Sequence, residues 1–249
     1  MPQIIAHRGA SFDAPENTIA AITLAWQQRA DAVEIDIRLT KDLQIVAIHD
    51  ADTARTCDRQ MVIAESTYAE LRQADAGRWK GSEYQGERVP RFADILATLP
   101  AQGRLFVEVK CGDEIIKPLS DQLAGNVKLQ SQLVLIGFNA PLIENLKRKL
   151  NAMTALLCVS ANDVDTVAWD EASVERLIDE VKQRKLDGVD LDAKGSIERE
   201  AVERFHHADL SCCFWTVDDP ADARQLAQCG VDGLTTNRPE WLRERFASE

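Results

Sequence analysis

The sequence lacks several features that would define other classes of protein. No apolar run approaches the roughly 20 residues that a membrane-spanning helix needs. The start of the chain carries no basic, signal-like segment, because Met1-Pro2-Gln3 leads directly into the strand-like IIAH. The six cysteines form no Cys-x-x-Cys pair or other metal-type spacing. We therefore expect reduced, mostly buried thiols in a cytoplasmic protein.

An excess of basic residues is also missing. The chain has 29 basic and 41 acidic residues among 249, for a net charge of −12. This balance disfavours nucleic acid and anionic membranes as partners. An anionic small molecule is still possible if a local cation reverses the field at its binding site, which suggests a metal. Nothing in the composition defines an oligomeric state.

Strand-like and helix-like segments alternate along almost the whole chain. The predicted strands are 3–7, 32–40, 104–110, 132–138, 154–160, 187–191, 211–217 and 231–236. The predicted helices are 17–29, 91–99, 114–124, 140–150, 169–185, 197–207, 219–229 and 238–246. Eight strands that are each followed by a helix predict an α/β protein with a single TIM (β/α)8 barrel domain spanning 1–249. An open doubly wound sheet is less favoured, since no G-x-G-x-x-G follows the first strand.

Two segments interrupt this alternation. LQIVAIHD (43–50) is a ninth strand candidate, and its connection to the second strand is too short for a parallel crossover. We expect a hairpin with a four-residue loop at 41–44, which would place Asp36 opposite His49. The polar segment 51–91 contains only one short helical piece, so we predict a small inserted cap or lid after the second strand.

AVEIDIRLT (32–40) alternates apolar residues with Glu34, Asp36 and Arg38. In a barrel the apolar side would face the helices, which points the two acids inward at the carboxyl end of the strand. RLFVEVK (104–110) adds Glu108 and Lys110 in the same alternation. Three converging carboxylates would repel unless a cation lay between them, and oxygen ligands favour Mg²⁺ or Ca²⁺. The alternative is a structural network in which Arg38 and Lys110 pair with the acids.

Two of the four histidines are predicted near these acids. His7 ends the first strand, and His49 returns to the same height through the hairpin. Two histidines beside a bound cation suit general acid–base catalysis. Either histidine taken separately would more simply be a hydrogen-bonded structural residue. His206 and His207 lie at the end of a predicted helix and are expected to be exposed.

A set of motifs in one order along the chain resembles the glycerophosphodiester phosphodiesterase family, in particular its cytoplasmic bacterial members. The motifs are IIAHRGA…APENT, EIDIRLTKD, IVAIHD, DAG, VP, FVEVK, FWTVD and GVDGLTTNRP. The resemblance implies a TIM barrel with an inserted subdomain between the second and third barrel strands, which matches 51–91.

The resemblance also implies roles for individual residues. Glu34, Asp36 and Glu108 would hold the divalent cation, and His7 and His49 would be the catalytic pair. Arg8 and Lys110 would contact the phosphate, and Phe138 belongs to a segment that keeps the family pattern. Trp215 would form an apolar wall against glycerol, or alternatively a core aromatic between strand and helix. Glu16 and Asn17 would support the site, or Asn17 would cap the first helix.

The chain also departs from the family pattern. Gly137 stands where serine is common, and GVDLDAK (188–194) replaces a more polar segment and adds Asp190 and Asp192 near the mouth. These two acids change what we expect of the alcohol pocket, and they leave the expected catalytic chemistry as it is.

The function predicted from the sequence is metal-dependent hydrolysis of glycerophosphodiesters to an alcohol and sn-glycerol 3-phosphate. Two alternatives are a lyase of the phospholipase C type that stops at a cyclic phosphate, and a non-catalytic barrel that binds phosphodiesters. The first would favour a secreted, membrane-binding chain. The second would normally have lost a histidine or an acid, and all of these are present.

Overall fold

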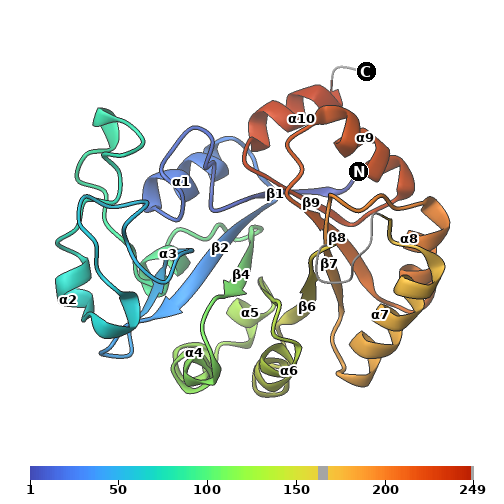
Figure 1. Cartoon of the computed structure of the whole chain (residues 1–249), viewed down its shortest axis with the longest axis horizontal. Coiled ribbons are helices and arrows are strands. Elements are labelled where there is room, and N and C mark those ends of the chain that lie inside the picture. Colours follow the sequence, from blue (N-terminus) through green and yellow to red (C-terminus); the bar gives the residue numbers. More distant parts are fainter. Residues whose placement is uncertain (162–167, 248–249) are drawn as a thin grey trace.

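Eight parallel strands close into a barrel in the computed structural model, which describes residues 1–161 and 168–247 (Figure 1). The barrel strands are β1 (Gln3–Ala6), β2 (Ala32–Leu39), β4 (Arg104–Val109), β5 (Leu133–Gly137), β6 (Thr154–Val159), β7 (Gly188–Asp192), β8 (Ser211–Trp215) and β9 (Gly233–Thr236). Their order is β1-β9-β8-β7-β6-β5-β4-β2, and pairing of β1 with β2 closes the ring. The predicted TIM barrel is confirmed, with each strand within two residues of its predicted bounds.

Helices follow the strands and cover the outside of the barrel (Figure 1). They are α1 (Ile19–Gln27), α3 (Phe92–Leu96), α4 (Ile116–Leu123), α5 (Val127–Gln130), α6 (Ala140–Lys149), α7 (Glu171–Gln183), α8 (Arg199–His207), α9 (Pro220–Cys229) and α10 (Pro239–Ala247), with a 3₁₀ turn, η3 (Asp113–Ile115), before α4. The apolar side of each strand packs against these helices in one large core. On β2 this side carries Val33, Ile35 and Ile37, which are fully buried, and it directs the acids of the same strand into the lumen.

The ninth strand, β3 (Ile45–Ala47), pairs antiparallel with β2 as predicted, but the predicted register is wrong by one residue. Leu39 pairs with Ile45, and the backbone N–H of Ile48 donates to the backbone oxygen of Asp36 at 3.0 Å. Asp36 therefore lies opposite Ile48, and His49 follows beyond the pairing.

The turn of this hairpin explains the shift. The backbone N–H of Thr40 donates to the backbone oxygen of Gln44 at 3.0 Å, so the loop is the three residues 41–43. Leu43 adopts a left-handed backbone with φ of 59°. Three-residue hairpin loops need one residue in this conformation, normally glycine, and leucine gave no such signal in the sequence.

The inserted segment 51–91 forms a small lobe beside β2 and β3, at the left of Figure 1. It contains η1 (Ile63–Glu65), α2 (Tyr68–Leu71) and η2 (Ser82–Tyr84). Four residues of the segment, Ile63, Leu71, Ala76 and Val89, form an apolar cluster with Val46 of β3 and with Ile48, which follows β3. The lobe thus packs on the hairpin through this cluster.

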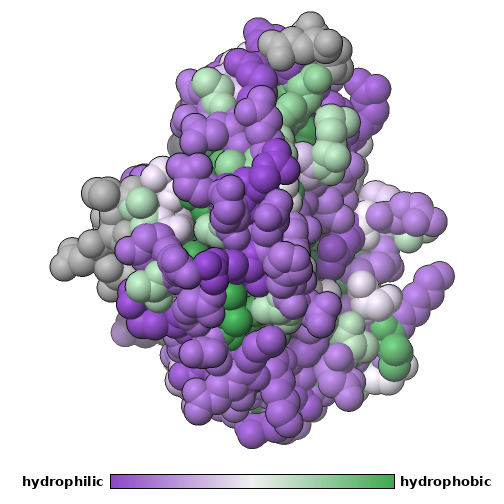
Figure 2. Space-filling model, turned by 90° about the vertical axis from the view of Figure 1, so that its right-hand side faces the viewer, coloured by the Kyte–Doolittle hydropathy of each residue, from purple (hydrophilic) through white to green (hydrophobic). Residues whose placement is uncertain are grey.

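One side of the molecule has a mostly hydrophilic surface. Figure 2 shows the side that carries α7 and α8, where apolar residues lie only in small scattered groups. No helix in the described part of the chain is long and apolar enough to cross a bilayer. Within the same residues all six cysteines are free, three of them buried and three half-buried. His206 and His207 are exposed at the end of α8, as predicted.

Candidate active site

One cavity of about 240 Å³ lies at the carboxyl ends of the barrel strands. It is lined by His7, Arg8, Glu34, His49, Glu108, Lys110, Ile136, Phe138, Cys158, Asp190, Trp215, Thr216 and Thr235. Eight of the nine site residues predicted from the sequence are in this lining. The ninth, Asp36, is fully buried beside the cavity, where its carboxylate contacts Asn17 and Arg8.

Glu34, Asp36 and Glu108 form a compact acidic cluster. Asp36 and Glu108 are register partners on adjacent strands, and one carboxylate oxygen from each of the three residues lies within 4.8 Å of the others. Glu34 Oε1 and Asp36 Oδ1 are buried and have no hydrogen-bond partner in the described residues. Two orphaned, buried carboxylate oxygens and a donor set made only of oxygen fit a hard divalent cation.

The raised pKa values of two of these carboxyl groups also indicate that a cation would stabilise the charged cluster. Burial, with Asp36 and Glu108 nearby, raises the pKa of Glu34 well above its usual range. Burial and the Asp36 carboxylate raise the pKa of Glu108 to about 7. A cation among the three carboxylates would reverse both effects, because it favours their charged forms.

Arg8 reaches the cluster from the loop after β1. Its backbone is left-handed, with φ of 57°, which turns its N–H toward Glu34 Oε2 at 2.9 Å. Its Nε lies 3.1 Å from Asp36 Oδ2, and Nη1 donates to Glu16 Oε1 at 2.9 Å. The following Gly9 also has positive φ, and a Cβ there would come within 2.6 Å of the Ala21 backbone. The H-R-G motif is therefore a tight turn that delivers a guanidinium to the acids.

Lys110 and Arg38 behave differently from each other. Lys110 Nζ donates to Glu108 Oε1 at 2.7 Å and lies 3.8 Å from Asp36 Oδ1. Arg38 contacts none of the three acids. Its Nε donates to the His49 backbone oxygen at 2.9 Å, and its Nη1 donates to the Lys110 backbone oxygen at 2.7 Å. The predicted structural network is thus present for Lys110 and wrong for Arg38, which holds two backbone segments in place.

Asn17 supports the cluster and does not cap α1. Its Nδ2 donates to Asp36 Oδ2 at 2.8 Å, and its Oδ1 accepts from the Asp36 backbone N–H at 3.1 Å. The N-cap of α1 is Thr18, whose hydroxyl accepts from the Ala21 N–H. Of the two predicted roles of Asn17, the structure therefore contains the supporting one.

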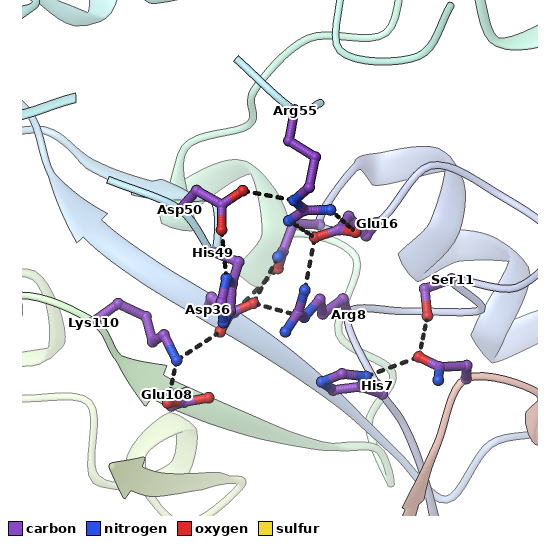
Figure 3. Close-up of polar contacts among 12 residues, drawn as sticks. His7, Arg8, Ser11, Glu16, Asp36, His49, Asp50, Arg55, Glu108 and Lys110 are labelled. Carbon is purple, nitrogen blue, oxygen red and sulfur yellow. Dashed lines mark hydrogen bonds and ion pairs between the residues drawn. The ribbon is translucent and has the colours of Figure 1, made fainter. Parts of the chain in front are cut away.

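His7 is held by residues from the far end of the chain. Its Nδ1 lies 2.8 Å from Asn237 Oδ1, and Ser11 Oγ donates to the same oxygen. Asn237 Nδ2 donates to Asp218 Oδ2, which fixes the orientation of the amide. His7 therefore donates from Nδ1 and keeps Nε2 free for the cavity (Figure 3). Burial and the neighbouring Arg8 lower the pKa of His7, so the ring is neutral.

His49 is held by a carboxylate from its own loop. Its Nδ1 lies 2.7 Å from Asp50 Oδ1, and Arg55 Nε donates to Asp50 Oδ2 at 2.6 Å. Arg55 also donates from both Nη atoms to Glu16, so it joins the inserted segment to the loop that carries Arg8 (Figure 3). Although burial opposes it, the hydrogen bonds from Arg55 and His49 lower the pKa of Asp50 to about 2. His49 thus has an ionised partner at Nδ1 and presents Nε2 to the cavity.

Two aromatic rings form one wall. Phe138 and Trp215 meet edge to face with centroids 5.6 Å apart, and Trp215 Nε1 donates to the Asp190 backbone oxygen at 3.1 Å. Trp215 therefore lines the cavity, and its alternative placement between strand and helix is wrong. A Cβ at Gly137 would point away from the cavity, 3.0 Å from Ile143 of α6, so this departure from the family affects packing rather than the pocket.

Sequence reasoning gave no role to Asp50, Arg55, Asp218 and Asn237. Asp50, Asp218 and Asn237 stand inside the quoted motifs IVAIHD, FWTVD and GVDGLTTNRP, so a signal was present without an assignment. Arg55 lies in the irregular insertion and had no signal.

A closed parallel barrel that gathers buried acids, two oriented histidines and two cations around one cavity is the fold and the site of a TIM-barrel enzyme. The model of the glycerophosphoryl diester phosphodiesterase family matches residues 7–241. The chain therefore belongs to this family, which confirms the resemblance.

Individual relatives agree over the full length. The chain is 31% identical over 244 residues to YhdW of Bacillus subtilis, covering 96% of both proteins. It is 28% identical to a glycerophosphodiester phosphodiesterase of Caldanaerobacter subterraneus, covering 96% of this chain and 95% of the relative. Among solved structures, an Oleispira antarctica phosphodiesterase in complex with the product sn-glycerol-3-phosphate superposes with a TM-score of 0.85 at 28% identity, covering 100% of this chain and 98% of that one.

Proposed function

We propose that the protein hydrolyses glycerophosphodiesters to an alcohol and sn-glycerol 3-phosphate, and that the reaction requires one divalent cation, Mg²⁺ or Ca²⁺. The observation that carries this proposal is the gathering of Glu34, Asp36 and Glu108 within 4.8 Å beside a cavity that both His7 and His49 line. The names of the relatives and the product bound to the Oleispira antarctica enzyme support the substrate class.

We place the substrate phosphate against the acidic cluster and against Arg8 and Lys110, the two cationic side chains that pair with it. Glu34, Asp36 and Glu108 would hold the ion, which when bound would supply positive charge to the phosphate and to the attacking oxygen. Arg8 and Lys110 donate to phosphoryl oxygens as negative charge develops on them. Both side chains are already fixed by carboxylates, so this stabilisation needs little rearrangement.

The two histidines divide the proton transfers. His7 is neutral and keeps Nε2 unprotonated, since Nδ1–H is committed to Asn237, which suits a general base that takes the proton of the attacking oxygen. His49 is more open, with 31% of its side chain exposed. We assign it as the general acid that protonates the leaving alcohol as the phosphorus–oxygen bond breaks.

The inserted segment 51–91 is proposed to act as a small cap that completes the site through Arg55. None of the described residues that line the cavity comes from this segment. One polar link from this segment to the site is the Arg55 guanidinium on Asp50 and Glu16. A cytoplasmic location, and the absence of nucleic-acid and membrane partners, stay predictions.

The decisive experiment assays purified protein on glycerophosphodiesters with different head groups, before and after chelation. We expect turnover that EDTA abolishes and that Mg²⁺ or Ca²⁺ restores. A phosphorus spectrum of the products should show glycerol 3-phosphate. A cyclic phosphate as the final product would identify a lyase, and tight binding without turnover would identify a binding module. Full activity of metal-free protein would refute the metal requirement.

A further inference from the structure

Two buried polar atoms of the cavity wall are left unexplained by the chemistry above. Asp190 is 1% exposed and Thr235 is 2% exposed, and both line the cavity. Asp190 Oδ1 and Thr235 Oγ1 have no hydrogen-bond partner in the part of the chain that the structure describes. Buried oxygens without a partner are rare because each costs about 1–3 kcal/mol. Two of them on one cavity indicate that a ligand supplies the missing hydrogen bonds.

Asp192, two residues further along β7, provides a comparison. It is nearly as buried as Asp190, with 3% exposure. Its Oδ1 accepts from the Lys194 backbone N–H at 3.0 Å, and its Oδ2 accepts from Ser160 Oγ at 3.3 Å. The protein therefore satisfies this carboxylate itself. Of the two acids that distinguish β7 from the family pattern, Asp190 is the one left for a ligand.

Asp190 lies on the other side of the barrel from β2, the strand that carries Glu34 and Asp36. In the ring of strands, β7 lies four steps from β2 in either direction, so Asp190 stands across the barrel from Glu34 and Asp36. Thr235 lies on β9, between the two sides. A ligand whose phosphate is held at the acidic cluster would extend its other end toward these two residues.

Apart from Thr216, the rest of this wall is apolar. Ile136, Cys158, Phe138 and Trp215 line the cavity together with Asp190 and Thr235. Apolar walls with a few fixed polar points are typical of sites for small organic ligands, in which the polar points set orientation. A three-carbon polyol matches this pattern, since its carbon chain can pack on the rings while its hydroxyls meet the two orphaned oxygens.

We propose that Asp190 and Thr235 form a hydroxyl-binding subsite that holds the glycerol end of the substrate. The inference rests on the proposed function and names which end of the phosphodiester lies deepest in the barrel. The alcohol is then left at the open side, near His49.

The chemical state of Asp190 supports a hydroxyl rather than a cationic group. Burial above all, with a contribution from the Glu108 carboxylate, raises the pKa of Asp190 to about 8, which favours the protonated carboxyl. A neutral carboxyl donates one hydrogen bond and accepts others, which complements an alcohol. An ionised carboxylate would instead favour a cationic group at this position.

The test compares the binding of sn-glycerol 3-phosphate and n-propyl phosphate, which has the same carbon chain and no hydroxyls. Both are titrated by calorimetry into Mg²⁺-loaded protein. We expect the wild type to prefer glycerol 3-phosphate by about 10²–10³-fold, because a site built for hydroxyls rejects an analogue without them. Asp190→Leu should remove most of this preference while leaving the affinity for propyl phosphate little changed. Thr235→Val should reduce the preference by about tenfold.

Control variants keep the result interpretable. Asp192→Asn changes a matched buried acid on the same strand, and it should lower stability without changing the preference. Asp190→Asn keeps a donor and an acceptor and should retain most of the preference for glycerol 3-phosphate. If Asp190→Leu does not fold, Asp190→Asn and Thr235→Val together test whether the subsite binds hydroxyls. Equal affinities in the wild type, no binding of either ligand, or an unchanged preference in both Asp190→Leu and Thr235→Val would overturn the inference. Stronger binding of phosphocholine that Asp190→Asn abolishes would overturn it in favour of a cationic ligand.

Turnover of glycerophosphodiesters is measured in parallel. Turnover without a preference for the hydroxylated ligand would overturn this inference alone. A preference without turnover would refute the proposed hydrolysis and leave the subsite in place.

Discussion

Asn17 contacts Asp36 twice, donating from Nδ2 to the carboxylate and accepting at Oδ1 from the backbone N–H. Asn17 is 3% exposed and adopts a left-handed backbone with φ of 58°. One side chain thus fixes both the position and the orientation of a carboxylate that the proposed cation needs.

Replacing Asn17 by glycine tests the two side-chain contacts while the backbone conformation stays the same. Glycine adopts positive φ without strain, so Asn17→Gly removes the amide and leaves the turn intact. We expect a loss of about 1–3 kcal/mol in stability, from the partners left unpaired, and a 10–100-fold loss in metal affinity. Metal titration followed by calorimetry checks this. Unchanged affinity would show that Asn17 has a structural role only.

Stability of the metal-free protein should depend on Glu108. Its pKa is raised from 4.5 to about 7, so the unfolded chain loses this proton at lower pH than the folded protein does. Between about pH 4.5 and pH 7 the unfolded state binds fewer protons, and stability must fall as pH rises. The contribution of Glu108 to this loss is complete above pH 7 and reaches about 3 kcal/mol.

Urea unfolding of the wild type and Glu108→Gln at pH 5 and pH 8 measures this difference. The wild type should lose more stability than the variant over this interval, and saturating Mg²⁺ should cancel the excess. Parallel pH profiles of the two proteins without metal would contradict the assignment. Metal should also raise the Tm more at pH 8 than at pH 5, because it binds the folded state and binds ionised carboxylates more tightly than protonated ones.

Substitutions of His49 and of Glu34 should have different effects on metal affinity and kcat. His49→Ala should leave metal affinity and stability nearly unchanged and lower kcat by roughly 10²–10⁴, the usual contribution of a positioned acid or base. Glu34→Ala should lose metal affinity and activity together. Melting temperature, metal affinity and kcat are measured on one preparation of each variant. A destabilised but fully active His49→Ala would show that this histidine is structural.

Asn237 should act through His7. Asn237→Ala removes the acceptor that keeps the proton on Nδ1, so we expect kcat to fall by at least about tenfold while the ring stays in place. The hydrogen bond that His7 donates to Asn237 also raises the pKa of His7, so its loss should move the acidic limb of the kcat/KM profile to lower pH. A purely structural role would lower stability and leave that limb where it is.

Arg55 should connect the inserted segment to catalysis. Arg55→Met breaks its contacts with Asp50 and Glu16 and should lower kcat by about tenfold, because Asp50 then no longer holds the His49 ring firmly. Tyr84→Phe is the matched control, since Tyr84 also joins the segment to the first loop through the Asp13 backbone oxygen but touches no catalytic group. Equal effects of the two variants on kcat would mean that the segment acts through packing alone.

The features that could be predicted from the sequence are those set by the alternation of residues within one strand. Alternation along β2 and β4 was enough to direct Glu34, Asp36 and Glu108 to one side, because neighbouring strands of a parallel barrel end at the same height. The hairpin register failed because Leu43 supplies a conformation that usually needs glycine. Arg55 and Asn237 could not be assigned, because their partners are set by tertiary packing that no local periodicity encodes.

The contact between His7 and Asn237 has a consequence for the order in which the enzyme is made. The two residues are 230 positions apart, and β1 pairs with β9 on one side and with β2 on the other. During synthesis β1 emerges first and its neighbour β9 emerges last, so the proton on the His7 ring is not directed until the ring of strands has closed. A chain that ends before β9 therefore lacks the residue that directs the proton of the proposed base. Under the proposed mechanism, activity requires the first and the last strand of the barrel to lie side by side.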